Sequence, residues 1–245
     1  MNRRLGLVTC DEIWEPLRSR HGDYADMIAH WLRAAGADFE LATWAAHEGR
    51  LPASVDECDA WIVSGSRAGV YEDLPWIAPL KQWVRAAHAA GRRQLGICFG
   101  HQLLAEALGG RTRRAPAGWG IGNVTMRLRA TLAGGPRGEA LSLYMAHQDQ
   151  VVALPPGALW IAEAPHCPHA IFAVGDSVLG VQAHPEFTTG FMREMASENS
   201  FSLSPELRAA ALASLDSPVD ALAAGQWAAS FLGLDVRAAN GRLKD

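Results

Sequence analysis

The sequence has little of what marks membrane-spanning, secreted or nucleic-acid-binding proteins. No apolar stretch among its 245 residues is long enough to cross a bilayer. The formal net charge of −4 indicates no basic surface for nucleic acid. The first residues, Met1–Arg4, lack the apolar core of a signal peptide and lead directly into a strand-like segment. We therefore expect a cytoplasmic protein that binds neither membranes nor nucleic acids.

Cysteine is also scarce, and the spacing of the few cysteines excludes two classes of site. The chain has four, with no Cys-x-x-Cys pair: Cys10, Cys58, Cys98 and Cys167. This pattern favours neither a disulfide framework nor a zinc site. His166 and His169 flank the last cysteine without a carboxylate in register, so we expect no metal and no other cofactor. A P-loop is missing too, so the chain is not expected to activate an acceptor with ATP.

The first hundred residues alternate between strand and helix patterns. With 49% hydrophobic and 20% charged residues, the composition is that of an ordinary globular protein. We predict strands at 5–9, 39–43, 60–64 and 94–97, and helices at 23–35, 76–90 and from Cys98 to Gly109–Gly110. This alternation is typical of an α/β fold, with a mostly parallel sheet covered by helices on both faces.

The pattern changes after Gly110. We expect antiparallel additions to the sheet at 122–128, 141–145, 160–162, 170–174 and 178–182. The last sixty residues are alanine-rich and predict a helical C-terminus. Within it, Ser204–Pro205 and Ser217–Pro218 each place an N-cap serine before a proline at the first helical position. We expect one domain over 1–245, with a core at about 5–190 and a helical extension at about 191–245.

The segment Gly96–Gln102 predicts a nucleophile. An apolar run stops at Cys98, which has a glycine two residues away on either side, and a helical segment follows. This is a Gly-x-Cys-x-Gly form of the sharp strand-to-helix turn that exposes a nucleophile at the end of a sheet. A thiolate there lies at a helix N-terminus, which favours negative charge. The alternative, a cysteine that only fills the core, does not account for the two glycines.

A base and its orienting partner are predicted at the end of a later strand. His184 and Glu186 follow an apolar run and are separated by Pro185, which suits a turn. In a catalytic triad of these residues, Cys98 would attack the substrate carbonyl, His184 would accept and donate the proton, and Glu186 would fix the tautomer of the imidazole. The sequence separation between Cys98 and His184 leaves their contact open.

Two polar segments fit the same chemistry. The glycine-rich stretch 64–73 follows a strand, and one of its N–H groups, together with that of Phe99, would form an oxyanion hole. The stretch 146–151 reads as a polar turn between apolar runs, suited to the polar end of a substrate. Trp119, between two glycines, is expected to line the pocket or an interface, and His101 to pack and form hydrogen bonds.

These segments together resemble the class I (triad-type) glutamine amidotransferases. The matching segments occur in the family's order and span roughly residues 5 to 190: 96–102, 182–186, the glycine loop ending at 70–72, and 147–151. The resemblance is closest to stand-alone, GMP-synthase-type members and extends to γ-glutamyl peptidases. It implies a flavodoxin-like fold.

The resemblance also implies a reaction and its residues. A γ-glutamyl amide such as glutamine would be hydrolysed through a γ-glutamyl thioester on Cys98. The implied oxyanion-hole residues are Gly65, Ser66 and Phe99; the implied substrate-binding residues are Gln102, His147, Gln148 and Asp149. Two positions depart from the family: Arg67 stands where proline is common, and Ala146 where serine is usual. Arg67 would favour a substrate carboxylate or point to solvent.

The sequence leaves several functions open. The protein is either an amidotransferase subunit that passes ammonia to a separate synthetase, or a free-standing hydrolase of γ-glutamyl peptides or amines. A non-catalytic binding module on the same fold is a further alternative, which the intact Cys98, His184 and Glu186 disfavour. A DJ-1-like thiol chaperone or protease also has an elbow cysteine, but the His-Pro-Glu and Gly-His-Gln segments suit the amidotransferases better.

Overall fold

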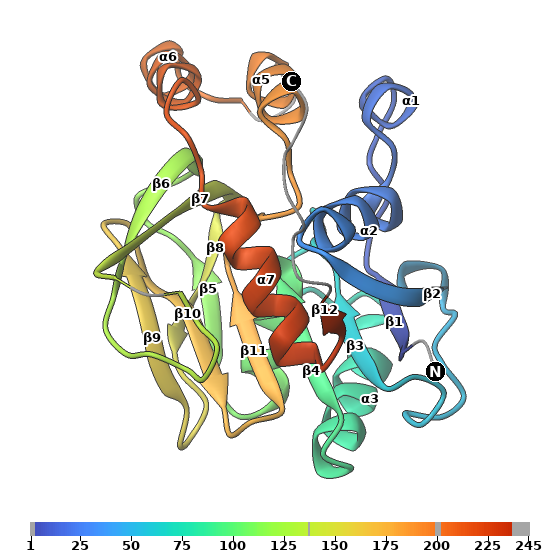
Figure 1. The fold of residues 1–245 in the computed structure, drawn as a ribbon. Helices are drawn as coiled ribbons and strands as arrows, with labels where there is room; N and C mark the ends of the chain where they lie inside the picture. Colours follow the sequence, from blue (N-terminus) through green and yellow to red (C-terminus); the bar gives the residue numbers. More distant parts are fainter. Residues whose placement is uncertain (1–2, 137, 199–201, 237–245) are drawn as a thin grey trace.

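The computed structural model describes residues 3–136, 138–198 and 202–236, and a ten-stranded sheet runs through them (Figure 1). Its strands, in sheet order, are β12 (Asp235–Val236), β2 (Ala37–Ala45), β1 (Arg3–Thr9), β3 (Ala60–Val63), β4 (Arg93–Ile97), β11 (Val178–Val181), β10 (Cys167–Val174), β9 (Leu159–Ala164), β6 (Gly120–Leu128) and β7 (Ala140–His147). The helices are α1 (Leu17–His21), α2 (Tyr24–Ala34), α3 (Ile77–Ala89), α4 (Phe99–Ala107), α5 (Thr189–Ser197), α6 (Pro205–Ser214) and α7 (Ala221–Leu232), with a 3-10 turn η1 (Ala46–Glu48). The expected mixed sheet, mostly parallel in its core and flanked by helices, is confirmed.

Five neighbouring strands, β2, β1, β3, β4 and β11, run parallel, and antiparallel strands extend the sheet on both sides. The prediction that 178–182 is an antiparallel addition was wrong, because β11 pairs in parallel with β4. All four residues of β11 are buried. A strand buried on both faces carries no alternation, so its pattern does not reveal the direction of its neighbour.

A separate two-stranded sheet, β5 (Arg111–Arg114) with β8 (Asp149–Ala153), was not predicted. It corrects the interpretation of 146–151 as a turn. Strand β7 runs to His147 and β8 starts at Asp149, so Gln148 alone connects them. His147 belongs to a strand because β7 pairs with β6, and Asp149 and Gln150 do because β8 pairs with β5.

Hydrophobic residues pack on both faces of the sheet. In β3 the side chains alternate, with Ala60 and Ile62 in the core under α2 and α7, and Trp61 and Val63 in the core under α3 and α4. The Trp61 ring contacts Trp83 of α3 edge to face, with 4.7 Å between ring centroids. Helices therefore cover both faces of the parallel strands, as Figure 1 shows for α2 and α7 on the near face.

Most predicted helix boundaries agree with the structure. Asp23 caps α2 in a capping box, and Gly36 after it has a φ of 90°. Ser204 accepts a hydrogen bond from the Leu207 N–H at 3.2 Å and caps α6 as predicted. Residues 199–201 and 237–245 of the expected helical extension lie outside the described residues.

The predicted helix start at Ser217–Pro218 was wrong, because α7 begins at Ala221. The Asn123 amide donates to the carbonyls of Ser217 and Pro218. Asp220 exchanges two hydrogen bonds of 2.8 Å with the Ser142 backbone on β7. These bonds to the sheet hold residues 217–220 in a non-helical conformation, which local sequence does not reveal.

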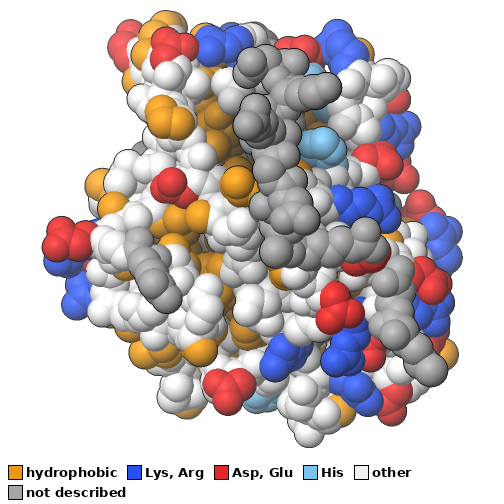
Figure 2. All heavy atoms as spheres, in the orientation of Figure 1, with side chains coloured by type: hydrophobic (Ala, Val, Ile, Leu, Met, Phe, Trp, Pro, Cys, Tyr) orange, Lys and Arg blue, Asp and Glu red, His pale blue; other side chains and the backbone are white. Residues whose placement is uncertain are grey.

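Charge is unevenly distributed over the face shown in Figure 2. Charged side chains gather over the α1, α2 and β2 side, and hydrophobic ones over the α7, β9 and β10 side. Many of the charged side chains at the surface are paired, as in Arg92–Asp56 at 2.6 Å. Exposed pairs contribute at most about 1 kcal/mol each, so core packing stabilises the fold. Among the described residues, no helix combines the length and the hydropathy that a membrane span requires.

The carboxyl ends of β1, β3, β4 and β11 lie side by side at one edge of the sheet. The segments that follow these strands therefore meet there, at the edge where open α/β sheets bind ligands. These segments carry Asp11, Gly65, Cys98 and His184.

Candidate active site

The turn that carries Cys98 has the predicted elbow geometry. Cys98 has φ 51° and ψ −102°, a left-handed conformation that is rare outside glycine, and it directly precedes α4. A Cβ on Gly96 would overlap the backbone of Gly100, and a Cβ on Gly100 would overlap the carbonyl of Val63. The two glycines are thus required because α4 lies directly against β3 and β4.

The structure brings together the three predicted triad residues. His184 Nδ1 lies 2.8 Å from Glu186 Oε1, and the Cys98 side chain lies close enough to the imidazole to interact with it electrostatically. All three side chains are buried. A carboxylate only accepts, so His184 Nδ1 donates to Glu186 and its Nε2 is left to serve Cys98. The parallel pairing of β4 with β11 places Ile97 opposite Val181, which brings the two strand ends together.

The charge state of His184 follows from these neighbours. Burial alone would lower the pKa of His184. The Glu186 carboxylate and the Cys98 side chain oppose that effect and raise the pKa to about 10. The imidazole is therefore positively charged at neutral pH in the resting site, and it holds a proton available for transfer.

The loop after β3 lies against the imidazole. A Cβ on Gly65 would come within 3.0 Å of His184 Cε1, so a larger residue would displace the ring. Ser66 lines the cavity, and its Oγ accepts a hydrogen bond from the Ala68 N–H at 3.1 Å. Phe99 is the first residue of α4, where backbone N–H groups have no acceptor within the helix.

A cavity of about 300 Å³ opens beside these residues. The residues that line it come from several segments of the described chain: Ile13, Trp14 and Tyr24; Ser66, Arg67 and Ala68; Cys98 and Gln102; Trp119; Ala146, His147, Gln148 and Asp149; and His184, Phe187, Phe191 and Met195. Of the two roles open for Trp119, the lining of the pocket is the one confirmed. The volume is at the lower end of that of small-molecule sites.

The four residues expected at the substrate end all line this cavity, and three of them bind other parts of the protein. Gln102 Nε2 donates to the Asp149 carbonyl at 2.7 Å and to Gln182 at 3.1 Å. Gln148 accepts from Arg114 at 2.7 Å, and the Asp149 carboxylate accepts from the Tyr71 hydroxyl at 2.9 Å. These bonds hold the β7–β8 connection rigidly at the cavity.

His147 differs from the other three. It is buried, its ring stacks on His166 with 5.4 Å between centroids, and neither ring nitrogen has a hydrogen-bond partner among the described residues. Burial lowers its pKa well below the usual range, so the ring is neutral. His101 is also buried and packs against Phe172 at 4.9 Å, in agreement with the packing role expected for it.

One side of the cavity was missed in the sequence. Phe187 stacks on the His184 ring with 4.0 Å between centroids, and Phe191 lies next to it at 4.4 Å. Tyr24, at the start of α2, is buried, and its hydroxyl lies close to Gly65. No local signal distinguishes these aromatic residues from ordinary core residues, because they approach the site only through the fold.

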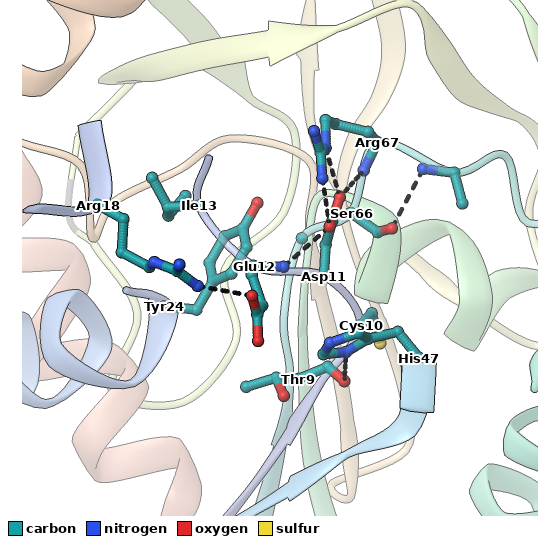
Figure 3. A network of polar contacts seen from close by, with 12 residues as sticks. Thr9, Cys10, Asp11, Glu12, Ile13, Arg18, Tyr24, His47, Ser66 and Arg67 are labelled. Carbon is teal, nitrogen blue, oxygen red and sulfur yellow. Dashed lines mark hydrogen bonds and ion pairs between the residues drawn. The ribbon is translucent and has the colours of Figure 1, made fainter. Parts of the chain in front are cut away.

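The Arg67 side chain is 60% exposed, but its guanidinium is already paired and so does not stand ready for a substrate carboxylate. Its guanidinium donates to both oxygens of Asp11 at 2.8 Å, as Figure 3 shows. The guanidinium also lies over the Trp14 ring, 5.7 Å from its centre. Asp11 was not identified in the sequence because it follows β1, far from the glycine loop along the chain.

Within the described part of the chain, one group of side chains has metal-ligating atoms within reach of one another: Glu12, His47 and Glu48. The Glu12 carboxylate pairs with Arg18 at 2.6 Å, and His47 Nδ1 lies 3.2 Å from the Thr9 carbonyl (Figure 3). Both glutamates are exposed. We regard the group as part of a surface network of polar contacts.

Comparisons with known proteins agree with this geometry. Over 200 residues the chain is 28% identical to γ-glutamyl peptidase 3 of Arabidopsis thaliana, covering 78% of this chain and 79% of that protein. It is 33% identical over 165 residues to a GMP synthase of Pyrobaculum aerophilum, covering 67% of this chain and 31% of that protein. A solved glutamine amidotransferase of Thermotoga maritima has a similar fold, with a TM-score of 0.77 at 18% identity over 95% of this chain and 99% of that one. The family model for glutamine amidotransferase class-I matches residues 21–202, and the chain therefore belongs to the class I glutamine amidotransferase family.

Proposed function

We propose that this protein hydrolyses γ-glutamyl amides, with Cys98 as nucleophile, His184 as acid and base, and Glu186 as the group that orients His184. The observation that carries the proposal is the clustering of the three side chains: His184 is hydrogen-bonded to Glu186 and lies beside Cys98, at a strained turn that opens into a cavity. The γ-glutamyl peptidases among its relatives agree with this reaction.

The reaction proceeds in two halves. Cys98 attacks the amide carbonyl carbon as the thiolate paired with protonated His184, and the resulting oxyanion accepts hydrogen bonds from the N–H of Phe99 and from the Gly65–Ser66 segment. His184 then gives its proton to the leaving nitrogen, the C–N bond breaks, and a γ-glutamyl thioester remains. The now neutral His184 takes a proton from water, which attacks the thioester; the C–S bond breaks, glutamate is released, and the thiolate and protonated His184 are restored.

The substrate's glutamyl end is assigned to the β7–β8 side of the cavity. Gln102, Gln148 and Asp149 are held there by hydrogen bonds, so the backbone around them offers fixed donors and acceptors. The neutral His147 ring has unpartnered nitrogens among the described residues, and it is the side chain most ready to contact the substrate. Ala146 has no hydroxyl, so at this position only the backbone can form a hydrogen bond with the substrate.

The first test is covalent labelling of the thiol. We expect 6-diazo-5-oxo-norleucine, an electrophile that mimics glutamine, to label the folded protein once, at Cys98, as read by intact-protein and peptide mass spectrometry. Excess glutamine should slow the labelling, and Cys98→Ser should take up no label. A folded wild-type protein that remains unlabelled would reject the proposed nucleophile.

Between the two versions of the function, the cavity favours a free-standing hydrolase of substituted γ-glutamyl amides. The group that protonates the leaving nitrogen must lie next to it, so the surroundings of His184 form the leaving-group side. Phe187 stacks on His184 and Phe191 lies next to it, and Trp14 and Met195 add apolar surface to the lining of the same cavity. Free ammonia gains nothing from such a wall, whereas an apolar amine or a peptide side chain buries surface against it.

Trp14→Ala should therefore change substrate preference. We expect kcat/KM for an aromatic γ-glutamyl amide to fall about tenfold, or roughly 1.4 kcal/mol, while that for glutamine changes less than about twofold. Trp14→Phe keeps an aromatic ring but loses the indole N–H that donates to Glu198 at 2.7 Å. It therefore separates the contact of the ring with the substrate from the hydrogen bond that anchors the segment after β1. Equal losses for both substrates in Trp14→Ala would contradict the assignment of this part of the cavity to the leaving group.

Hydrolysis of glutamine only in the presence of a synthetase would favour the subunit version of the function.

A further inference from the structure

Asp11 ties the segment after β1 to the segment after β3. Three hydrogen bonds reach it from Arg67: the backbone N–H donates to Oδ2 at 2.9 Å, Nε to Oδ2 at 2.8 Å, and Nη2 to Oδ1 at 2.8 Å (Figure 3). This is a bidentate arginine–carboxylate pair with an added main-chain bond. The two parallel bonds fix both the direction and the distance of the pair, although the Arg67 side chain is 60% exposed.

The surroundings of Asp11 make this contact a stable one. Its side chain is 16% exposed, and the Glu12 N–H donates to Oδ1 at 2.8 Å. Burial alone would raise the pKa of Asp11, but the bonds from Arg67 and the Glu12 N–H lower it below its usual value. The carboxylate is therefore ionised, and the pair intact, throughout the neutral range.

The segment after β3, which Asp11 binds through Arg67, contains the glycine loop of the proposed oxyanion hole. Arg67 directly follows Gly65 and Ser66, which we assign to the oxyanion hole, and a side chain on Gly65 would crowd the His184 ring. Glycine leaves the backbone free to adopt many conformations, so the rigidity of this loop has to come from bonds to its neighbours. On the β3 side, the Ser64 hydroxyl donates to the Gly65 carbonyl at 2.9 Å. On the other side, the bonds include the Ser66–Ala68 turn, the Gly69 N–H to Glu72 bond at 2.9 Å, and the bonds to Asp11.

We propose that Asp11 is a positioning residue: acting through Arg67, it holds the Gly65–Ser66 backbone in the geometry that binds the oxyanion. The inference rests on the proposed function. Oxyanion donors accelerate a reaction only if they are already in place when charge develops, and one donor contributes on the order of 10²- to 10³-fold in kcat. Without the bonds to Asp11, the Gly65–Ser66 N–H groups would no longer be held in the position that binds the oxyanion.

The test compares Asp11→Ala, Asp11→Asn, Arg67→Ala and the double variant Asp11→Ala/Arg67→Ala, with glutamine and a γ-glutamyl anilide as substrates. We expect Asp11→Ala to lower kcat about 10- to 100-fold while KM changes less than about threefold, because the oxyanion exists only beyond the ground state. Asp11→Asn keeps one acceptor oxygen and replaces the other with a donor, so its kcat should fall between those of Asp11→Ala and wild type. Arg67→Ala should add no further loss in the Asp11→Ala background, since both act through one contact.

A matched control is available on the surface. Arg92 donates to Asp56 at 2.6 Å and 3.0 Å, and the two residues precede β4 and β3 at the amino ends of these strands, opposite the end that carries Cys98. Asp56→Ala therefore removes an arginine–aspartate pair away from the site and should leave kcat unchanged. Alkylation of Cys98 by iodoacetamide should proceed at the wild-type rate in every variant, which shows that the thiol and His184 are intact. Thermal melting then reports any loss of folding separately.

The outcomes separate the inference from the proposed function. Wild-type kcat in Asp11→Ala and Asp11→Asn, with at most a lower melting temperature, would assign Asp11 a purely structural role and overturn the inference. A rise in KM with unchanged kcat would overturn it as well, because it would place Asp11 in substrate binding. A wild-type protein that hydrolyses no γ-glutamyl substrate would reject the proposed function, and this inference with it.

Discussion

Cys98→Ala should abolish γ-glutamyl amide hydrolysis, lowering kcat by at least about 10⁴-fold without unfolding the protein. The mechanism has no other nucleophile, and alanine fits the space that the buried thiol occupies. His184→Gln should cost a comparable amount, and the double variant little more than either, because the two residues act as one unit. Steady-state rates and thermal melting measure both effects.

Cys58→Ala is the matched control for this experiment. Cys58 is also a buried thiol, but it precedes β3 at the amino end of the parallel strands, opposite the edge that carries Cys98. The variant should retain wild-type kcat. A Cys98→Ala protein that hydrolyses its substrate at the wild-type rate would exclude the thioester mechanism.

Glu186→Gln is expected to lower kcat by about 10²- to 10⁴-fold. Glutamine has nearly the size of glutamate, so the substitution removes a charge and leaves the packing. The variant loses the Glu186 carboxylate, which can only accept a hydrogen bond and so keeps a proton on His184 Nδ1. It also loses the negative charge that stabilises the protonated imidazole. An unchanged kcat in Glu186→Gln would remove Glu186 from the triad.

The same variant should change how stability depends on pH. The folded pKa of His184, about 10, exceeds its ordinary value of 6.5. Protonated His184 therefore adds stability in full below pH 6.5, and this contribution disappears as the pH rises toward 10. Without the Glu186 charge the pKa is raised less, so the free energy of unfolding of Glu186→Gln should decline less steeply between pH 6.5 and 10. Urea denaturation across that range measures the slope, and equal slopes would contradict the assigned coupling.

The sequence was most informative where geometry forces particular residues into consecutive positions. The elbow needs glycine at 96 and 100 because a Cβ at either position meets backbone atoms, so the motif and the shape are inseparable. His184 and Glu186 are two residues apart after a buried strand, and Pro185 between them suits a turn, which predicts that both side chains approach the same pocket. The parallel core was predictable for a similar reason, since buried runs alternate with capped helices.

What the sequence left out depends on contacts between distant segments. Trp14 and Met195 line the cavity because the segment after β1 and α5 both reach over it, and neither residue differs in its local pattern from a core residue. The role of Asp11 follows only from its hydrogen bonds with Arg67, which the structure shows and the sequence does not. The direction of β11 and the true start of α7 were set by partner strands, which local propensity does not describe.

The parallel pairing of β11 with β4 also sets an order of events during synthesis. Cys98 emerges from the ribosome long before His184, and the strand that delivers His184 joins the sheet only after β5 to β10 have been made. Contacts between such distant segments form late in folding. A nascent or truncated chain that ends before β11 thus carries Cys98 without its base, and the reactive pair is assembled only in a chain whose sheet is nearly complete.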